Sequence, residues 1–230
     1  VSHVSLARIN ADGSVDPTFA APDAAFTGAV FGMMRQADGK LVVSGLRLAS
    51  DATYGPPLVR LNTDGSNDAT FLPDSSIGPA TYIDSIFPLP GDRMLLAASD
   101  STSQKHYLRF GMDGASEPEF PAPTDDFSST GTYAVAEQSD RRLVVAGGFT
   151  RFRGATVGRI MRFLPDGSRD SGFVASADAT VYALALQPDG KLVLGGEFSS
   201  VNNTAVPRMA RLNADGSLDS TFRPGFGPDR

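Results

Sequence analysis

The stretch RLNADGSLDSTF at 211–222 combines asparagine, aspartate and glycine in a spacing that could bind a calcium ion. A calcium loop places oxygen ligands at its first, third and fifth positions, just before a glycine. Before Gly216, the first position holds Arg211, the third Asn213 and the fifth Asp215. A guanidinium cannot ligate a cation and repels one. The stretch therefore favours a structural hairpin over a metal site.

The arginine motif recurs along the chain, which ties its residues to a repeated architecture. Every copy has aspartate four residues after the arginine, glycine five after and an acid eight after, and ends in phenylalanine; the copies lie at 6–19, 58–71, 107–120, 160–173 and 209–222. A three-residue hairpin loop that closes on a left-handed residue requires glycine there. If Ala214, Asp215 and Gly216 form that loop, Arg211 lies opposite Asp219. We expect a cross-strand ion pair in each copy, which fixes the register of the hairpin.

The phenylalanine that closes each copy is expected to wedge between neighbouring repeats rather than to contact a ligand. A second motif alternates with the first, at 37–45, 90–98, 139–148 and 188–196, as in PDGKLVLGG. Between the motifs, VYALALQ at 181–187 is apolar on both faces, so we expect a strand that is buried on both sides.

These signals predict four short antiparallel strands in each unit of roughly 45–50 residues, which is typical of a propeller blade. The predicted fold is all-β, a β-propeller of four-stranded antiparallel blades with four complete repeats and an N-terminal half repeat. The chain is either a single propeller domain over 1–230 or a segment of a propeller, with repeats at 4–20 (half), 28–72, 80–121, 130–174 and 179–223. A β-solenoid is the main alternative.

The paired motifs RLNADGSLDSTF and LALQPDGKLVLGGEF resemble the delta-60 repeat of bacterial proteins, a β-propeller repeat family. The similarity covers nearly the whole chain. It implies a large, often exported, multidomain bacterial parent, and hence an extracellular or cell-surface location. It implies no activity and no catalytic residues.

The hairpin at 4–20 lies outside the four complete repeats. Since it duplicates the outer strands that the last repeat already has, it does not close that repeat by ordinary strand exchange. Three alternatives remain: a four-bladed ring with an accessory hairpin, a segment of a larger propeller, or chains that pair to complete one ring. The last two make self-association, or neighbouring segments of a longer parent chain, candidate partners.

Composition excludes several functional classes. The net charge of -6 without a long basic run gives no footprint for nucleic acid, and no apolar run is long enough to span a membrane. The absence of cysteine excludes a thiolate metal site and a cysteine nucleophile. His3 and His106 lie in no catalytic or metal-binding spacing. We therefore predict no catalytic residue, no metal and no cofactor.

Function is sought where the repeats disagree. Aligned on the second motif, one inner-strand column reads Phe31, Asp84, Tyr133 and Tyr182, and another contains Glu137. We expect a noncatalytic scaffold or binding module for a protein or glycan, with these tyrosines and acids as candidate binding residues. One alternative is a carbohydrate-active enzyme that uses Asp84 and Glu137 as channel carboxylates. Another is a calcium-stabilised adhesive module. The divergent repeat at 80–121 is either a partner surface or a decayed copy.

Overall fold

The computed structural model describes residues 6–20, 29–45, 58–74, 77, 82–99, 105–117, 131–152 and 154–223. Every regular element among these residues is a β-strand, which confirms the all-β class. No helix in the described part of the chain is long and apolar enough to cross a membrane. The chain divides into two compact units, Val1–Pro118 and Glu119–Arg230.

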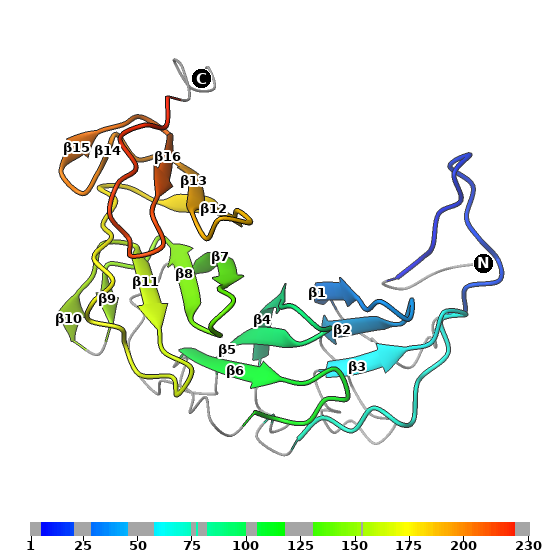
Figure 1. Cartoon of the computed structure of the whole chain (residues 1–230). Coiled ribbons are helices and arrows are strands. Elements are labelled where there is room, and N and C mark those ends of the chain that lie inside the picture. The colour runs from blue at the N-terminus through cyan, green and yellow to red at the C-terminus, as the bar shows by residue number, and fades with distance from the viewer. Residues whose placement is uncertain are drawn as a thin grey trace. The chain divides into compact units, whose positions relative to one another are not determined.

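The first unit contains two three-stranded antiparallel sheets, coloured blue to green in Figure 1. In one sheet the order is β1 (Val30–Arg35), β2 (Leu41–Gly45) and β3 (Leu58–Leu61). In the other it is β4 (Tyr82–Pro88), β5 (Met94–Ser99) and β6 (Lys105–Phe110). The central strands β2 and β5 are formed by the second motif, whose apolar residues are almost entirely buried.

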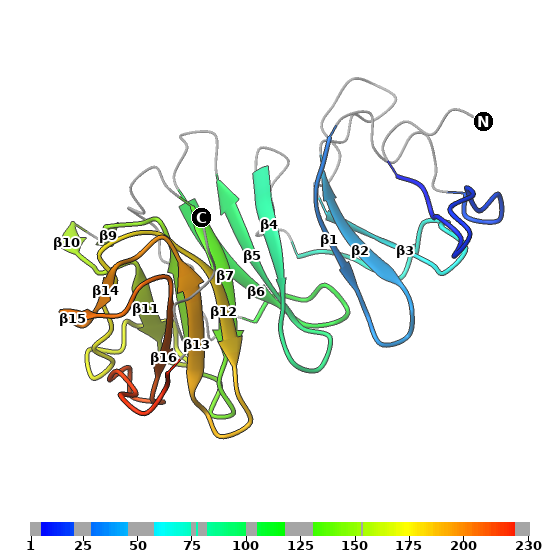
Figure 2. The same cartoon turned by 90° about the horizontal axis from the view of Figure 1, so that it is seen from above.

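The second unit repeats this plan, and Figure 2 shows its strands side by side. One sheet has the order β7 (Thr132–Glu137), β8 (Leu143–Gly147) and β11 (Ile160–Phe163). The other has the order β12 (Val181–Leu186), β13 (Leu192–Gly196) and β16 (Met209–Leu212). Two small hairpins interrupt the repeats, β9 (Arg151–Phe152) with β10 (Ala155–Thr156), and β14 (Ser200–Val201) with β15 (Thr204–Ala205).

The fourth strand predicted for each repeat is reduced to one isolated bridge among the described residues. The bridges are Ile9↔Val15, Leu61↔Asn67, Phe110↔Ser116, Phe163↔Arg169 and Leu212↔Leu218. Each complete repeat therefore has a three-stranded sheet and a short hairpin, whereas the half repeat has the hairpin alone. We call this hairpin the hairpin arm and define it as the segment from the motif arginine to its phenylalanine. The three-residue loop leaves only a few residues to pair before the chain turns away.

The arms have the register that the sequence predicts. In the last arm, Gly216 donates to the carbonyl of Asn213 at 2.9 Å, and Asp219 donates to the carbonyl of Arg211 at 2.8 Å. The loop glycines have positive φ, for example +92° at Gly216 and +85° at Gly13. Glycine is required there because an L side chain is strained in this region.

Of the closing phenylalanines that are described, Phe19, Phe71 and Phe173 are buried as predicted, whereas Phe222 is only half-buried. Phe71 and Phe173 are buried, and a Cβ atom at Gly114 or Gly216 of the following repeat would lie only 2.9 Å from their rings. These glycines thus let each ring lie between neighbouring arms. Phe120 lies outside the described residues.

The prediction that 181–187 is buried on both sides is wrong. Tyr182, Ala183 and Ala185 are exposed on β12. The strand lies at the edge of its sheet, and one apolar face consists of small side chains that no described sheet covers. Apolar composition on both faces therefore did not require burial on both faces.

Candidate functional site

The charges of the hairpin arms are paired with one another. Arg211 donates from Nε to Asp219 at 2.8 Å, and equivalent pairs join Arg8 to Asp16, Arg60 to Asp68, Arg109 to Glu117 and Arg162 to Asp170. The predicted cross-strand ion pair is thus confirmed in every arm.

A second cation, which the sequence analysis did not assign, contacts the same acid. Lys191 of the second motif lies 2.7 Å from Asp219, and Lys40 lies 2.8 Å from Asp68. These lysine hydrogen bonds are the largest cause that lowers the pKa of both aspartates. The detectable signal was a basic residue at the same place in every second motif. Both motifs therefore build one structural clamp.

The loop aspartates, which raised the question of calcium, have a local role. Asp215 accepts hydrogen bonds from the backbone N–H and the hydroxyl of Ser217, at 2.9 and 2.7 Å. The hydroxyl bond is the main cause that lowers the pKa of Asp215. The described residues contain no cluster of three or more His, Cys, Asp or Glu that could hold a metal. This geometry supports a turn-stabilising role for Asp215.

The column that differs between repeats coincides with a backbone irregularity. Each innermost strand carries a β-bulge, and the bulged residues are Phe31, Asp84, Tyr133 and Tyr182. A bulge inserts one residue into the strand and redirects its side chain. All four are exposed, whereas the strand residue before each is buried, as Ile83 and Val181 are, or partly buried, as Val30 and Thr132 are. One local device thus presents a different side chain in each repeat.

Two of these bulged residues form an aromatic pair in the second unit. The rings of Tyr133 on β7 and Tyr182 on β12 have centroids 5.5 Å apart and planes inclined by 48°. Both side chains are about half exposed, at 48% and 49%. Exposed Ala183 and Ala185 continue the surface along β12. The result is an open aromatic surface on the inner strands.

Glu197 adds a carboxylate to this surface. It directly follows β13, and its N–H donates to the carbonyl of Thr180 at 2.9 Å, which holds the segment beside the start of β12. Its hydrogen bond with the Tyr182 phenol is the main cause that raises the pKa of Tyr182, with burial and the charge of Glu197 next. We call Tyr133, Tyr182 and Glu197 the tyrosine site. It offers two aromatic faces and a hydrogen-bond acceptor.

The structure places the two candidate carboxylates differently. Asp84 is exposed and accepts a hydrogen bond from the Ser99 hydroxyl at 2.8 Å. Glu137 is buried at the end of β7, where it pairs in register with Leu143. Asp84 belongs to the first unit and Glu137 to the second, so neither unit by itself contains the pair. Their joint catalytic role stays a prediction.

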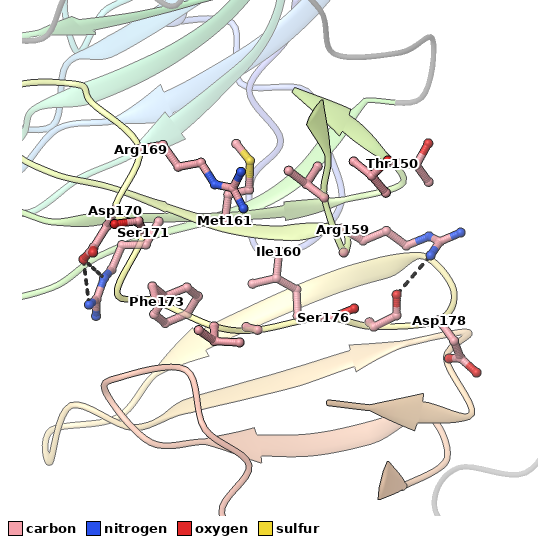
Figure 3. A pocket seen from close by; sticks show the side chains of 17 residues that line it. Thr150, Arg159, Ile160, Met161, Arg169, Asp170, Ser171, Phe173, Ser176 and Asp178 are labelled. Carbon is pink, nitrogen blue, oxygen red and sulfur yellow. Dashed lines mark hydrogen bonds and ion pairs between the residues drawn. The ribbon is translucent and has the colours of Figure 1, made fainter. Parts of the chain in front are cut away.

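A polar pocket of about 530 Å³ lies beside β11 in the second unit (Figure 3). Arg159 and Asp178 lie toward one end of it, and Asp170 toward the other. Arg159 donates to the carbonyl of Ala177 at 3.0 Å, and Asp178 accepts hydrogen bonds from the N–H groups of Ser199 and Ser200. Since Asp170 pairs with Arg162, these charges support the surrounding loops. The tyrosine site is the stronger candidate for binding.

Solved structures with the same fold share little sequence with the chain. PorZ, a bacterial surface component of the type IX secretion system of Porphyromonas gingivalis, matches at a TM-score of 0.55 and 9% identity over 90% of this chain and 30% of PorZ. The Xanthomonas campestris gluconolactonase XC5397 matches at a TM-score of 0.50 and 16% identity, over 91% of this chain and 65% of the enzyme. A Staphylococcus aureus virginiamycin B lyase, solved in a catalytically inactive form with quinupristin, matches at a TM-score of 0.50 and 14% identity. The match covers 84% of this chain and 54% of the lyase.

The chain spans less than two thirds of the length of each of these three proteins. At these identities the similarity shows the fold alone. No curated protein matches the sequence.

A family model matches the sequence directly, at residues 1–19, 36–71, 138–173 and 187–222. The last three matches each run from a glutamine before the second motif to the phenylalanine of the arm. The divergent repeat at 80–121 lies outside the matched residues. Together the matches cover more than half of the sequence, and they fall on the repeats whose clamps are described above. The chain therefore belongs to the β-propeller family described as a domain of unknown function, DUF5122.

Proposed function

We propose that this chain is a noncatalytic β-propeller binding module of a bacterial surface or secreted protein, and that it binds a glycan at the tyrosine site. The observation that carries the proposal is the half-exposed pair of Tyr133 and Tyr182, raised out of neighbouring inner strands by two bulges. Ordinary packing leaves large aromatic side chains more deeply covered than this.

The chemistry of the tyrosine site suits a sugar ring. One face of a pyranose is apolar, because its C–H bonds point to that side, and it can stack on a tyrosine ring. Its hydroxyls lie around the rim, where the carboxylate of Glu197 can accept hydrogen bonds. The two rings are tilted by 48°, which suits two successive sugar units better than one flat surface.

The proposal also covers the type of repeat, the number of strands in a blade and the location of the parent protein. We infer that the repeat is the delta-60 repeat, that each blade has four strands once the arm is counted, and that the parent protein lies outside the cell. The surface location of PorZ agrees with this inference. We also infer that the scaffold contacts protein partners, further copies of this chain or neighbouring segments of a longer parent.

The test is a glycan array followed by calorimetric titration of the best ligand. Tyr133→Ala and Tyr182→Ala should each weaken binding about tenfold or more, which corresponds to ~1.4 kcal/mol. Glu197→Gln should weaken it less, because the amide keeps one acceptor. Tyr82→Ala is the matched control, since Tyr82 is similarly exposed but is not a bulged residue. Equal losses in the control, or no glycan ligand at all, would reject the tyrosine site.

An enzyme is the second candidate, because two of the similar folds are a lactonase and a lyase. It depends on Asp84 and Glu137 acting together. Assays with aryl glycosides and simple lactones distinguish the two functions. Turnover that is abolished in Asp84→Asn and retained in Tyr182→Ala would replace the binding module with a carbohydrate-active enzyme.

A further inference from the structure

Neighbouring repeats within each unit meet through the same set of side chains. We call this set the trailing face of a repeat. It consists of a glutamine before the second motif, one apolar residue on each of two strands, and the arginine and phenylalanine of the arm. In two repeats the set is Gln36, Val42, Leu58, Arg60 and Phe71, and Gln138, Val144, Ile160, Arg162 and Phe173.

The partner of a trailing face is the arm of the next repeat. Arg60 donates from Nη1 to the carbonyl of Met112 at 2.7 Å, and Arg162 does the same to Ala214 at 2.5 Å. Arg8 reaches Thr63 in this way at 2.5 Å. In every case the acceptor stands three residues after the next arginine. The junction is therefore a repeated, directional interface.

The second part of each junction is apolar. Phe173 and Ile160 pack with Leu212 of the following repeat, and all three are buried. Phe71 and Leu58 pack with Phe110 in the same way. In both junctions, the residue that directly follows the motif arginine thus covers the trailing face of the repeat before it.

Repeat 179–223 carries the same trailing face without a described partner. Its members are Gln187, Val193, Met209, Arg211 and Phe222. Within the described ranges, Gln187 Oε1 is buried and accepts no hydrogen bond, although its counterpart Gln138 accepts one from Arg162 at 3.0 Å. Arg211 donates to Asp219, but among the described residues it has no backbone carbonyl of a following repeat to donate to, as Arg60 and Arg162 have. The three apolar members are only half-buried, whereas their counterparts in the earlier repeats are buried.

The complementary surface lies on the first arm. Its loop, Asn10 to Ser14, has the sequence NADGS, identical to the loop at 213–217 that receives Arg162 and Phe173. No atom lies within 4 Å of a Cβ built at Gly13, while one built at Gly216 meets Phe173. Ile9 is 57% exposed, whereas its counterpart Leu212 is fully buried. The first arm thus presents the parts that a trailing face binds.

We propose that the trailing face of repeat 179–223 binds the first arm of a second copy of this chain. The carbonyl of Ala11 receives Arg211, Ile9 covers Met209 and Phe222, and Gly13 gives room for the Phe222 ring. This contact continues the interface already formed between repeats 130–174 and 179–223. It is heterologous, since two different surfaces meet, and it therefore builds head-to-tail assemblies.

The experiment uses the full chain and two positions on opposite sides of the contact, exposed Ile9 and half-buried Phe222. Wild-type protein should show a sedimentation coefficient that rises with concentration. Ile9→Glu and Phe222→Glu should each sediment as monomers, because each places a charge in the apolar contact. Leu72→Glu is the matched control, since Leu72 is also exposed, at 75%, but lies outside the contact. It should associate as the wild type does.

Mixing the two monomeric variants tests the direction of the contact. The Ile9→Glu copy keeps an intact trailing face, and the Phe222→Glu copy keeps an intact first arm, so one good junction is restored. A one-to-one pair and nothing larger supports the proposal. A wild type that stays monomeric at every concentration, or an Ile9→Glu variant that associates as the wild type does, would overturn it.

Discussion

The hairpin arms and the bulged inner strands differ in how they use their polar and aromatic groups. In an arm, the acid is bound by two cations and the closing phenylalanine is buried, as at Asp68 and Phe71. At the bulges, Tyr133 and Tyr182 stand half exposed on otherwise ordinary apolar strands. The difference supports the proposal that the charged motif maintains the repeat and that the variable bulge binds a ligand.

This comparison follows from the energetics of burial. A buried charge is retained only where it is paired and hydrogen-bonded, so a repeated acid and arginine are expected to satisfy each other. A bulged residue has no such constraint, because its side chain points away from the sheet. It can change from phenylalanine to aspartate to tyrosine without disturbing the core.

The largest effect that separates the two regions should come from their aromatic residues. Phe173→Ala removes a buried ring between neighbouring arms and should lower the free energy of unfolding by ~4 kcal/mol. Tyr182→Ala removes a half-exposed ring that contacts Tyr133 and Glu197 at the surface, and should lower it by about 1 kcal/mol. Urea unfolding of both variants measures the difference. Similar losses in the two would end the distinction between arm and bulge.

The next effect concerns the arginines of the arms. Arg60→Leu should destabilise the protein by about 3 kcal/mol, because it breaks a buried pair with Asp68 and deprives the Met112 carbonyl of its donor. Arg8→Leu is the matched change in an exposed arm, where the side chain is 42% exposed, and should cost less than about 1 kcal/mol. Equal costs, measured by urea unfolding, would mean that burial does not decide the strength of the clamp.

The smallest effect on stability is expected from lowering the pH. The pKa values of Asp68 and Asp219 are lowered in the folded protein, so their contribution is fully present above the unfolded pKa of about 3.9 and is lost as pH falls through the lower folded values. The urea midpoint should thus hold down to about pH 4 and fall below it. Asp68→Asn should show a shallower fall than wild type. An identical pH profile in the variant would exclude Asp68 as a contributor.

The arms could be predicted from sequence because their chemistry is local. Arg211 and Asp219 lie eight residues apart across a three-residue loop, so spacing alone fixed their pairing. The lysine clamp required Lys191 to meet Asp219 across 28 residues, and only repetition hinted at it. The bulge at Tyr182 and its contact with Tyr133 depend on register and on the neighbouring strand. No periodicity within one strand encodes them.

The most direct test measures binding and stability on the same two variants. Tyr182→Ala should lose glycan affinity about tenfold and lower its urea midpoint only slightly, whereas Arg162→Leu should lower the midpoint much more and keep its affinity while it is folded. That crossed result supports the account, in which the arms stabilise the repeat and the tyrosine site binds. Loss of glycan affinity in folded Arg162→Leu, with full affinity in Tyr182→Ala, would contradict it.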